Sequence, residues 1–251
     1  MGKTTTAVNL ATALAACEKR VLVVDFDPQG NASTGLGVTP ERRTRNIYQV
    51  IIGGAALAET VIETAVPGMW LVPADAALSG AELELVHIPR RESRLRLVLA
   101  DVREDYHYIL IDCPPALGLL TLNALVAADA VLVPLQTEFY ALEGLSLLIR
   151  TIRRVKRGLN PNLEIQGIVL TMFDCRNNLC DMVARDVRAY LGETVYDTVI
   201  PRNVRVSEAP SHGKPVLLYD MHCAGAQAYI CLAREVLRRE QALGHRVALA
   251  S

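Results

Sequence analysis

The sequence has almost no net charge and very few lysines. It carries 26 basic against 27 acidic residues, and lysine supplies only four of the basic ones. Because no overall field attracts a polyanion, binding to nucleic acid or to acidic lipid would need a local patch of positive charge. The preference for arginine, together with abundant alanine, is typical of a GC-rich genome.

Long apolar runs and a secretion signal are also lacking. The longest apolar stretch, residues 124–135, is interrupted by Asp129 and is shorter than the ~20 residues that cross a bilayer. The N-terminus shows no basic segment followed by an apolar core and a cleavage site. We therefore expect a cytoplasmic protein.

The cysteines show no paired spacing. None of them forms a C-x-x-C motif, which metal sites and redox pairs commonly use. Together with the expected cytoplasmic location, this predicts reduced, mostly packed thiols rather than disulfides or a metal set. The six are Cys17, Cys113, Cys175, Cys180, Cys223 and Cys231.

Apolar, β-rich runs alternate with helix-length segments along the chain. The runs that read as strands are 20–25, 70–73, 108–112, 130–134, 165–171 and 194–200. Apolar residues at three- and four-residue spacing predict helices over 4–17, 91–104, 142–158, 181–191 and 225–243. This alternation predicts an α/β fold with a mostly parallel sheet and helices on both faces, in a single domain over residues 1–251.

Three loops follow predicted strand ends, where open α/β sheets bind ligands. They are residues 25–37, 112–120 and 201–215. The first begins with Asp25 and Asp27, and alternation along an extended chain would direct these two carboxylates to the same side. The second begins with Asp112, at the end of the apolar run Tyr-Ile-Leu-Ile, where a carboxylate can hold Mg²⁺ through water.

The chain opens with Met-Gly-Lys-Thr, directly before a predicted helix. Gly2, Lys3 and Thr4 match the second half of the phosphate-loop pattern G-x-x-x-x-G-K-[ST]. In such a loop, backbone N–H groups at the helix N-terminus hold phosphate oxygens, the lysine neutralises the β/γ charge, and the threonine hydroxyl ligates Mg²⁺. The tripeptide alone is a weak signal, and a chance match remains the alternative.

Three longer motifs make the signal specific. They are Asp25-x-Asp27-Pro-Gln-Gly-Asn, Asp112-Cys-Pro-Pro, and Pro201-Arg-Asn-Val-Arg followed by Ser-Glu-Ala-Pro-Ser-His-Gly-Lys-Pro. In this order, and over essentially the whole chain, they closely resemble the ParA/Soj family of chromosome-partitioning ATPases. The resemblance implies a P-loop NTPase fold and the use of ATP and Mg²⁺.

The resemblance also implies roles for individual residues. Asp27 matches the carboxylate that positions or activates the attacking water, and Lys3 acts with it in catalysis. Thr4 and Asp112 match the Mg²⁺ site, and Asp25 supports it. The ATP-binding residues implied are Gly2, Lys3, Thr4, Thr5, Met172, Pro201 and Asn203. For the last three, a plain structural turn is the alternative.

In this family the phosphate loop reads Lys-Gly-Gly-x-Gly-Lys-Thr, and its first lysine reaches the partner's nucleotide across a dimer. The present sequence starts at the x. The resemblance therefore implies that the signature lysine and a first, central strand are missing, which leaves neighbouring strands with unpaired groups that cost ~1–3 kcal/mol each when buried. We interpret Met1 as a misassigned start.

The resemblance further implies an ATP-bound homodimer that binds DNA without sequence preference on the nucleoid. A ParB-like partner would stimulate hydrolysis and release the subunits, and no membrane is involved. Arg176 and Arg205 match the DNA-binding positions, since arginines at phosphates give sequence-blind affinity. Solvated surface charge is the alternative for both. Weaker candidates are Arg185, Arg188 and Arg202.

Two other functions remain as alternatives. A MinD-like positioning ATPase would bind a membrane through a C-terminal amphipathic helix, but the apolar stripe of Tyr229, Leu232, Val236 and Leu243 reads as core packing. A non-hydrolysing nucleotide-binding regulator would follow if the truncation is genuine, since the trans-acting lysine would be lost. ATP hydrolysis by the chain separates the second alternative from the main interpretation.

Overall fold

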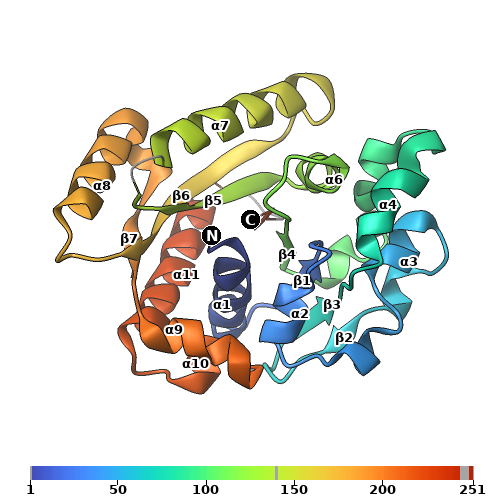
Figure 1. Ribbon diagram of the computed structural model, residues 1–251, viewed down its shortest axis with the longest axis horizontal. Coiled ribbons are helices and arrows are strands. Elements are labelled where there is room, and N and C mark those ends of the chain that lie inside the picture. Colours follow the sequence, from blue (N-terminus) through green and yellow to red (C-terminus); the bar gives the residue numbers. More distant parts are fainter. Residues whose placement is uncertain (1, 139–140, 244–248, 251) are drawn as a thin grey trace.

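The structure is a computed structural model that describes residues 2–138, 141–243 and 249–250 and, within them, one eight-stranded sheet covered by helices (Figure 1). The strand order is β2-β3-β1-β4-β8-β5-β6-β7, and among the described strands only the β2–β3 pair is antiparallel. The strands are β1 Val21–Asp25, β2 Ile62–Glu63, β3 Met69–Val72, β4 Tyr108–Asp112, β5 Ala130–Gln136, β6 Glu164–Phe173, β7 Val195–Pro201 and β8 Leu249–Ala250.

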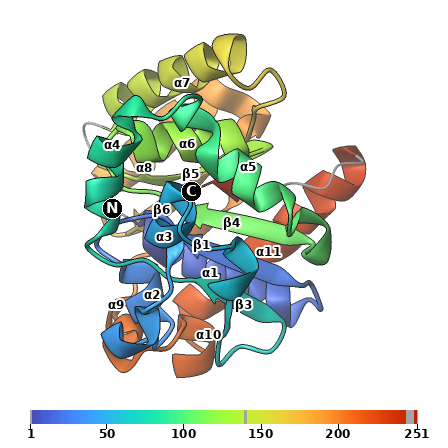
Figure 2. The same cartoon turned by 90° about the vertical axis from the view of Figure 1, so that its right-hand side faces the viewer.

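Helices lie on both faces of the sheet, as Figure 2 shows from the side. Each strand of a parallel sheet is buried on both faces, so its side chains alternate between two cores. In β1, Leu22 and Val24 belong to one apolar cluster, whereas Val21 and Val23 belong to the other. This confirms the predicted α/β architecture with two helical layers.

The first helical layer packs on the side of Leu22 and Val24. It contains α3 Ile47–Ile52, α4 Leu78–Glu84, α5 Arg94–Ala100, α6 Leu119–Ala127, α7 Ala141–Gly158 and α8 Asn178–Leu191. The second layer contains α1 Lys3–Ala16, α2 Asn31–Gly35, α9 Val204–Glu208, α10 Val216–Tyr219 and α11 Ala224–Leu243. Helix α1 is buried from Thr6 to Ala15 because the sheet covers one side and α11 the other.

The predicted strands are confirmed, with ends that differ by at most two residues. The predicted helix over 91–104 is shorter: α5 spans two turns and is flanked by 3₁₀ turns. The loops over 25–37 and 201–215 each contain a short helix, α2 and α9. On α11, Tyr229, Leu232 and Val236 are buried in the core as predicted, and the side chain of Leu243 lies outside the described residues.

A C-terminal strand lies between β4 and β5, where the sequence predicted a missing partner. Leu249 pairs with Leu110 and Ala130, and Ala250 pairs with the next residue of each strand. The two residues of β8 are fewer than the five of β4 and the seven of β5. The expectation of unpaired central strands is therefore wrong for the two positions that β8 pairs.

The thiols are less uniformly packed than predicted. Cys113 and Cys180 are buried, but Cys175 and Cys231 are exposed, and the described cysteines are all free. Among the described helices, none is both long and apolar enough to cross a membrane.

Glu240 of α11 is a buried carboxyl, and it accepts hydrogen bonds from Tyr108 of β4 and from Gln166 of β6, the latter at 3.3 Å. Burial raises the pKa of Glu240 from 4.5 to about 7, although the Tyr108 hydroxyl and Lys19 lower it. Between pH 4.5 and about pH 7, Glu240 therefore keeps its proton in the folded chain but has lost it in the unfolded chain. Folding stability therefore falls as pH rises through this range.

We expect the native chain to lose about 2 kcal/mol more unfolding free energy between pH 5 and pH 7.5 than the Glu240→Gln variant, whose side chain does not titrate. Urea denaturation at both pH values measures this difference. Other buried carboxyls contribute the same pH dependence to both proteins, so their contributions cancel in the difference. Equal pH dependence of the two proteins would contradict the assignment.

Candidate nucleotide site

The N-terminus of α1 is open at the edge of the sheet where the parallel strands end. Gly2, the residue before the helix, has φ 105° and gives no side-chain cap, and the first turn contains no acidic residue. The first N–H groups of a helix have no internal partners and carry the positive end of its dipole. This end of α1 is therefore suited to an anion.

A polar cavity of about 700 Å³ opens at this helix end. It brings together five of the predicted site residues, which lie at the start of α1 and on the loop after β1. They are Gly2, Lys3, Thr4, Thr5 and Asp27. These five residues thus supply backbone donors, an ammonium group, hydroxyls and a carboxylate, as a nucleoside triphosphate requires.

The sequence interpretation gave no role to Lys214, although it also lines this cavity. The chain has four lysines, and two of them, Lys3 and Lys214, face the same cavity. In a sequence that otherwise uses arginine, a lysine inside a family motif was the available signal. Lys214 adds a second positive charge to the lining of this cavity.

Asp25 and Asp112 are side by side, because β1 and β4 pair in parallel with these two residues in register. Asp25 is fully buried and its Oδ2 accepts hydrogen bonds from the Ser33 N–H at 2.8 Å and the Ser33 hydroxyl at 2.6 Å. Burial raises the pKa of Asp25 to about 6, although Ser33 opposes the shift. The two hydrogen bonds from Ser33 therefore fix the Asp25 carboxylate in place, so its role is to support the loop.

Asp112 differs from Asp25, since neither of its buried carboxylate oxygens has a hydrogen-bond partner among the described residues. Burial, followed by the charge of Asp25, raises the pKa of Asp112 to about 8, whereas the nearby Thr4 hydroxyl and Lys3 lower it. A buried carboxylate without partners is costly unless a cation or a proton satisfies it. Asp112 is thus the group that a cation would stabilise most.

These residues fit a magnesium ion held mainly by phosphate and water. Carboxylate and hydroxyl oxygens are the ligands that Mg²⁺ prefers, and the ion usually keeps several waters beside one or two protein groups. Within the described ranges, no group of three or more His, Cys, Asp and Glu side chains forms a metal cage. Thr4 and the orphaned Asp112 are the protein groups that would hold such an ion.

The loop that carries Asp27 is ordered by its own backbone. The Asp27 side chain accepts a hydrogen bond from the Gln29 N–H at 2.9 Å, and the Gly30 N–H donates to the Asp27 carbonyl at 2.9 Å. Gly30 has φ 62°, a conformation that favours glycine. Asp27 is 6% exposed and still lines the cavity, so the loop aims it inward.

Sequence reasoning missed Arg43, which fixes this loop from behind. Its guanidinium is buried and donates to the carbonyls of Val38 at 2.6 Å, Gly30 at 3.3 Å and Ala74 at 3.4 Å, and to the Thr34 hydroxyl at 2.8 Å. A β-carbon on Gly30 would lie 2.5 Å from this guanidinium. Arg43 therefore ties the Asp27 loop and α2 to the segment after β3.

Replacing Arg43 with methionine is expected to lower the unfolding free energy by about 2–4 kcal/mol, because buried carbonyls would lose their donors. Hydrogen exchange across residues 28–38 should accelerate at the same time. The exposed neighbour provides the control, since Arg42→Met should change neither measurement. Unchanged exchange in Arg43→Met would contradict a role in ordering this loop.

Three predicted nucleotide residues do not line this cavity: Met172, Pro201 and Asn203. Met172 has φ 54°, a strained conformation for a residue other than glycine. The Asn203 side chain caps α9 by accepting a hydrogen bond from the Arg205 N–H at 2.9 Å. Pairing of Phe173 with Pro201 keeps the three close to one another. That these three residues bind the base of ATP remains a prediction.

The two predicted DNA-binding arginines are exposed but ion-paired. Arg176 forms a two-point pair with Asp174, at 2.9 and 2.8 Å, and this pairing lowers the pKa of Asp174 to about 2. Arg205 lies 3.0 Å from Glu208 and 3.6 Å from Asp220. The sequence interpretation did not include these carboxylates, which offset the positive charge at both positions.

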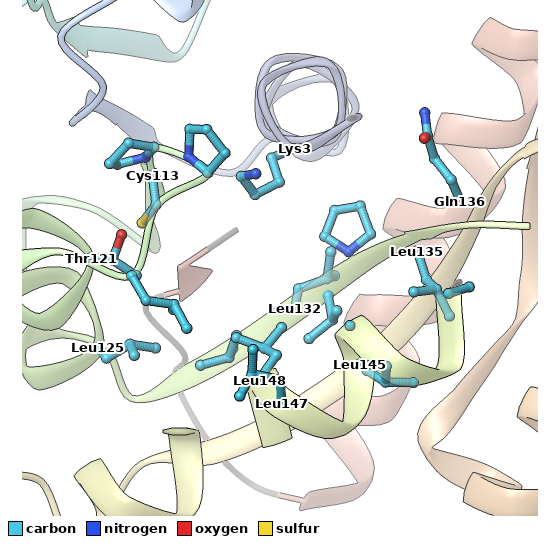
Figure 3. A pocket seen from close by; sticks show the side chains of 18 of the residues that line it. Lys3, Cys113, Thr121, Leu125, Leu132, Leu135, Gln136, Leu145, Leu147 and Leu148 are labelled. Atoms are coloured by element: carbon cyan, nitrogen blue, oxygen red, sulfur yellow. The ribbon is translucent and has the colours of Figure 1, made fainter. Parts of the chain in front are cut away.

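A second cavity, of about 480 Å³, lies beneath Lys3 and is mainly apolar (Figure 3). Consecutive residues of β5, from Val131 to Gln136, line it. Because successive strand residues point to opposite faces, this cavity runs along the edge of β5 rather than over one face. Its leucine-rich lining offers little to a phosphate, so the polar cavity is the candidate nucleotide site.

Solved structures of similar fold support this assignment. The chain superposes on cobyrinic acid a,c-diamide synthase from Mycobacterium smegmatis with a TM-score of 0.83 and 35% identity, over 98% of this chain and 93% of the other. That protein was crystallised with ADP and magnesium. The sheet order, the open helix end and the orphaned Asp112 define this chain as a P-loop nucleotide-binding protein of the α/β class.

Sequence comparison specifies the family. A family model described as an AAA domain matches residues 1–165. The chromosome partitioning protein ParA of Caulobacter vibrioides is 61% identical over 243 residues, which is 96% of this chain and 91% of ParA. The sporulation initiation inhibitor protein Soj of Bacillus subtilis is 51% identical, over 94% of this chain and 93% of Soj. The chain belongs to the ParA/Soj family of chromosome partitioning proteins.

Proposed function

We propose that this chain is a Mg²⁺-dependent ATPase that segregates DNA. The observation that carries the proposal is the convergence of Lys3, Thr4 and Asp27 on one polar cavity beside the unsatisfied carboxylate of Asp112. The relatives named as partitioning proteins support the same function. We further propose that ATP binding brings two copies together, and that a ParB-like partner stimulates hydrolysis.

The residues have distinct tasks in this proposal. The N–H groups at the start of α1 and the Lys3 ammonium bind the phosphates and offset their charge. Asp27 orients the attacking water, and Thr4 and Asp112 hold Mg²⁺, which would neutralise charge on the terminal phosphates. Asp25 and Arg43 keep the loop that carries Asp27 in place through Ser33 and Gly30.

We propose that the loops after β6 and β7 form the DNA-binding surface. Pairing of Phe173 with Pro201 places these two loops next to each other, so Arg176 and Arg205 contribute to one exposed edge. Their ion pairs with carboxylates oppose binding to phosphate. DNA must therefore compete with Asp174 for Arg176, which favours weak, salt-sensitive association on a nucleoid.

Replacing both Arg176 and Arg205 with glutamate should weaken binding to a nonspecific duplex at least about tenfold and reduce the salt slope by about two. Replacing Asp174 with asparagine should have the opposite effect, because Arg176 is then freed. Fluorescence anisotropy with labelled DNA and ATP measures both. Arg42→Glu with Arg96→Glu is the control at exposed arginines elsewhere. Equal affinities for all four proteins would exclude this surface.

A non-hydrolysing regulator is the competing function. It would bind nucleotide through Lys3 and Thr4 without turnover. A MinD-like membrane protein is less favoured, because Tyr229, Leu232 and Val236 of the apolar stripe on α11 are buried in the core. Measured ATP hydrolysis by this chain would exclude the regulator, and the same protein would then serve for the DNA-binding test.

A further inference from the structure

A third hollow, distinct from the two cavities described above, lies on the helical layer that contains α4, α6 and α7. Helices α4, α6 and α7 lie on the same face of the sheet and surround it (Figures 1 and 2). The groove has a volume of about 1010 Å³. Its apolar lining includes Leu83, Val86, Leu117, Leu122, Leu125, Val155 and Leu159.

Several of these apolar side chains are exposed to solvent. Leu83 is 77% exposed and Leu117 is 50% exposed, and Val86 and Leu159 are also exposed. Single exposed leucines are common, but a group of them along one groove marks a surface that another molecule covers. These apolar side chains favour binding of a protein segment that also carries apolar side chains. They do not favour a nucleic acid, whose outer surface is phosphate and sugar.

Helix α7, which borders the groove through Thr151, Arg154, Val155 and Gly158, carries a stripe of positive charge. On α7, Arg150, Arg153, Arg154 and Arg157 follow helical spacing on one face, with Lys156 beside them, and all five are exposed. Among the described residues, no salt bridge involves any of the five. Of these five, Arg154 is the one that lines the groove, and the others lie beside it on α7. This wall would attract acidic side chains of the occupant.

The opposite wall is different in charge. Glu82 and Glu92 line it together with Arg91, whose guanidinium donates to the Val86 carbonyl at 2.7 Å. Glu82 Oε1 accepts a hydrogen bond from the Leu120 N–H at 3.2 Å. The groove thus has Arg154 and the neighbouring basic residues on its α7 side, and Glu82 of α4 with Glu92 of the turn Arg91–Ser93 on its other side. It would therefore orient a segment with charges of opposite sign on its two flanks.

We propose that this groove binds an amphipathic helical segment of a partner protein, with apolar side chains on the floor and acidic side chains along α7. The groove reaches the segment that follows Asp112, since Leu117, Gly118 and Leu119 are part of its lining. A β-carbon on Gly118 would lie 2.5 Å from Glu82 Oε1, so α4 and this segment pack closely. An occupant would therefore sense the state of the nucleotide site, a consequence that rests on the proposed ATPase function.

The probe is a fluorescein-labelled synthetic helix of about 18 residues, with leucines on one stripe, glutamates on one flank and lysines on the other. Anisotropy should show binding to the native chain. Arg150→Glu with Arg154→Glu should weaken binding about tenfold. Arg234→Glu with Arg238→Glu is the matched control, because these exposed arginines are also four residues apart on a helix.

A charge-swapped probe, with lysines in place of the glutamates, should bind the Arg150→Glu/Arg154→Glu variant better than the native chain. Leu83→Asp should weaken the binding of both probes. Equal binding by a probe with glutamines in place of its glutamates would overturn the proposal. Competition by a DNA duplex that depends on Arg150 and Arg154 would overturn it as well, and would assign the stripe to nucleic acid.

Probe binding and ATP turnover are measured independently, so the groove proposal and the ATPase proposal can be contradicted separately. The variants lie outside the polar cavity, so ATP turnover without the probe should be unchanged in all of them. If the native chain binds the probe but hydrolyses no ATP, the groove proposal is supported and the ATPase proposal is contradicted. If it hydrolyses ATP and binds no probe, the groove proposal alone is overturned.

Discussion

Replacing Lys3 with alanine is expected to lower ATP turnover at least about 100-fold and to weaken nucleotide binding. Lys3 and the N–H groups at the start of α1 lie at the end of the polar cavity where we propose that the phosphates bind. Removal of one charged or hydrogen-bonding group from such a site costs about 100- to 1,000-fold in rate. Phosphate release and titration with a fluorescent ATP analogue measure the two effects.

The control for Lys3→Ala is Lys156→Ala, which removes the same charge from an exposed position on α7. It should leave basal turnover and nucleotide affinity unchanged. Lys3→Arg keeps the charge and tests whether the compact ammonium group is needed at the helix end. Native-like turnover in Lys3→Ala would show that the phosphates bind elsewhere, for example along the wall that carries Lys214.

Replacing Asp27 with alanine is expected to lower turnover about 100- to 1,000-fold while nucleotide affinity changes little, because the residue acts on the attacking water. The structure holds Asp27 in the cavity through the Gln29 N–H. Single-turnover hydrolysis and nucleotide titration separate the two quantities. Nucleotide-dependent association of two copies should persist in this variant.

Asp27→Asn is the second variant, since it keeps the size and the hydrogen bond from Gln29 but removes the charge. If both substitutions abolish nucleotide binding, Asp27 is a structural residue of the loop. If both leave turnover intact, another group orients the water. The control is Asp101→Asn, at an exposed position at the end of α5.

The long elements could be predicted from the sequence because their burial leaves a simple pattern. A parallel strand buried on both faces is a continuous run of Val, Ile and Leu, as in β1 and β4. The placement of Lys3, Asp27 and Asp112 could also be predicted, since Lys3 begins α1, Asp27 follows β1 and Asp112 ends β4. Parallel topology then brings such positions to one edge of the sheet.

The remaining features depend on tertiary contacts that leave no local pattern. Short elements such as α2 and β8 have too few residues to show a period. Arg43 looks like a surface charge in the sequence, and only the fold surrounds it with carbonyls. The pairing of Arg176 with Asp174 could have been noticed from their spacing, whereas that of Arg205 with Asp220 required the fold.

The measurement that tests the central proposal most directly is ATP turnover by the 251-residue chain with Mg²⁺, with and without nonspecific DNA and a ParB-like partner. The proposal predicts slow Mg²⁺-dependent hydrolysis that rises several-fold when both are present and that is lost in the Lys3→Ala variant. Binding of ATP without hydrolysis under every condition, by a chain shown to be folded, would contradict it and would identify a nucleotide-binding regulator.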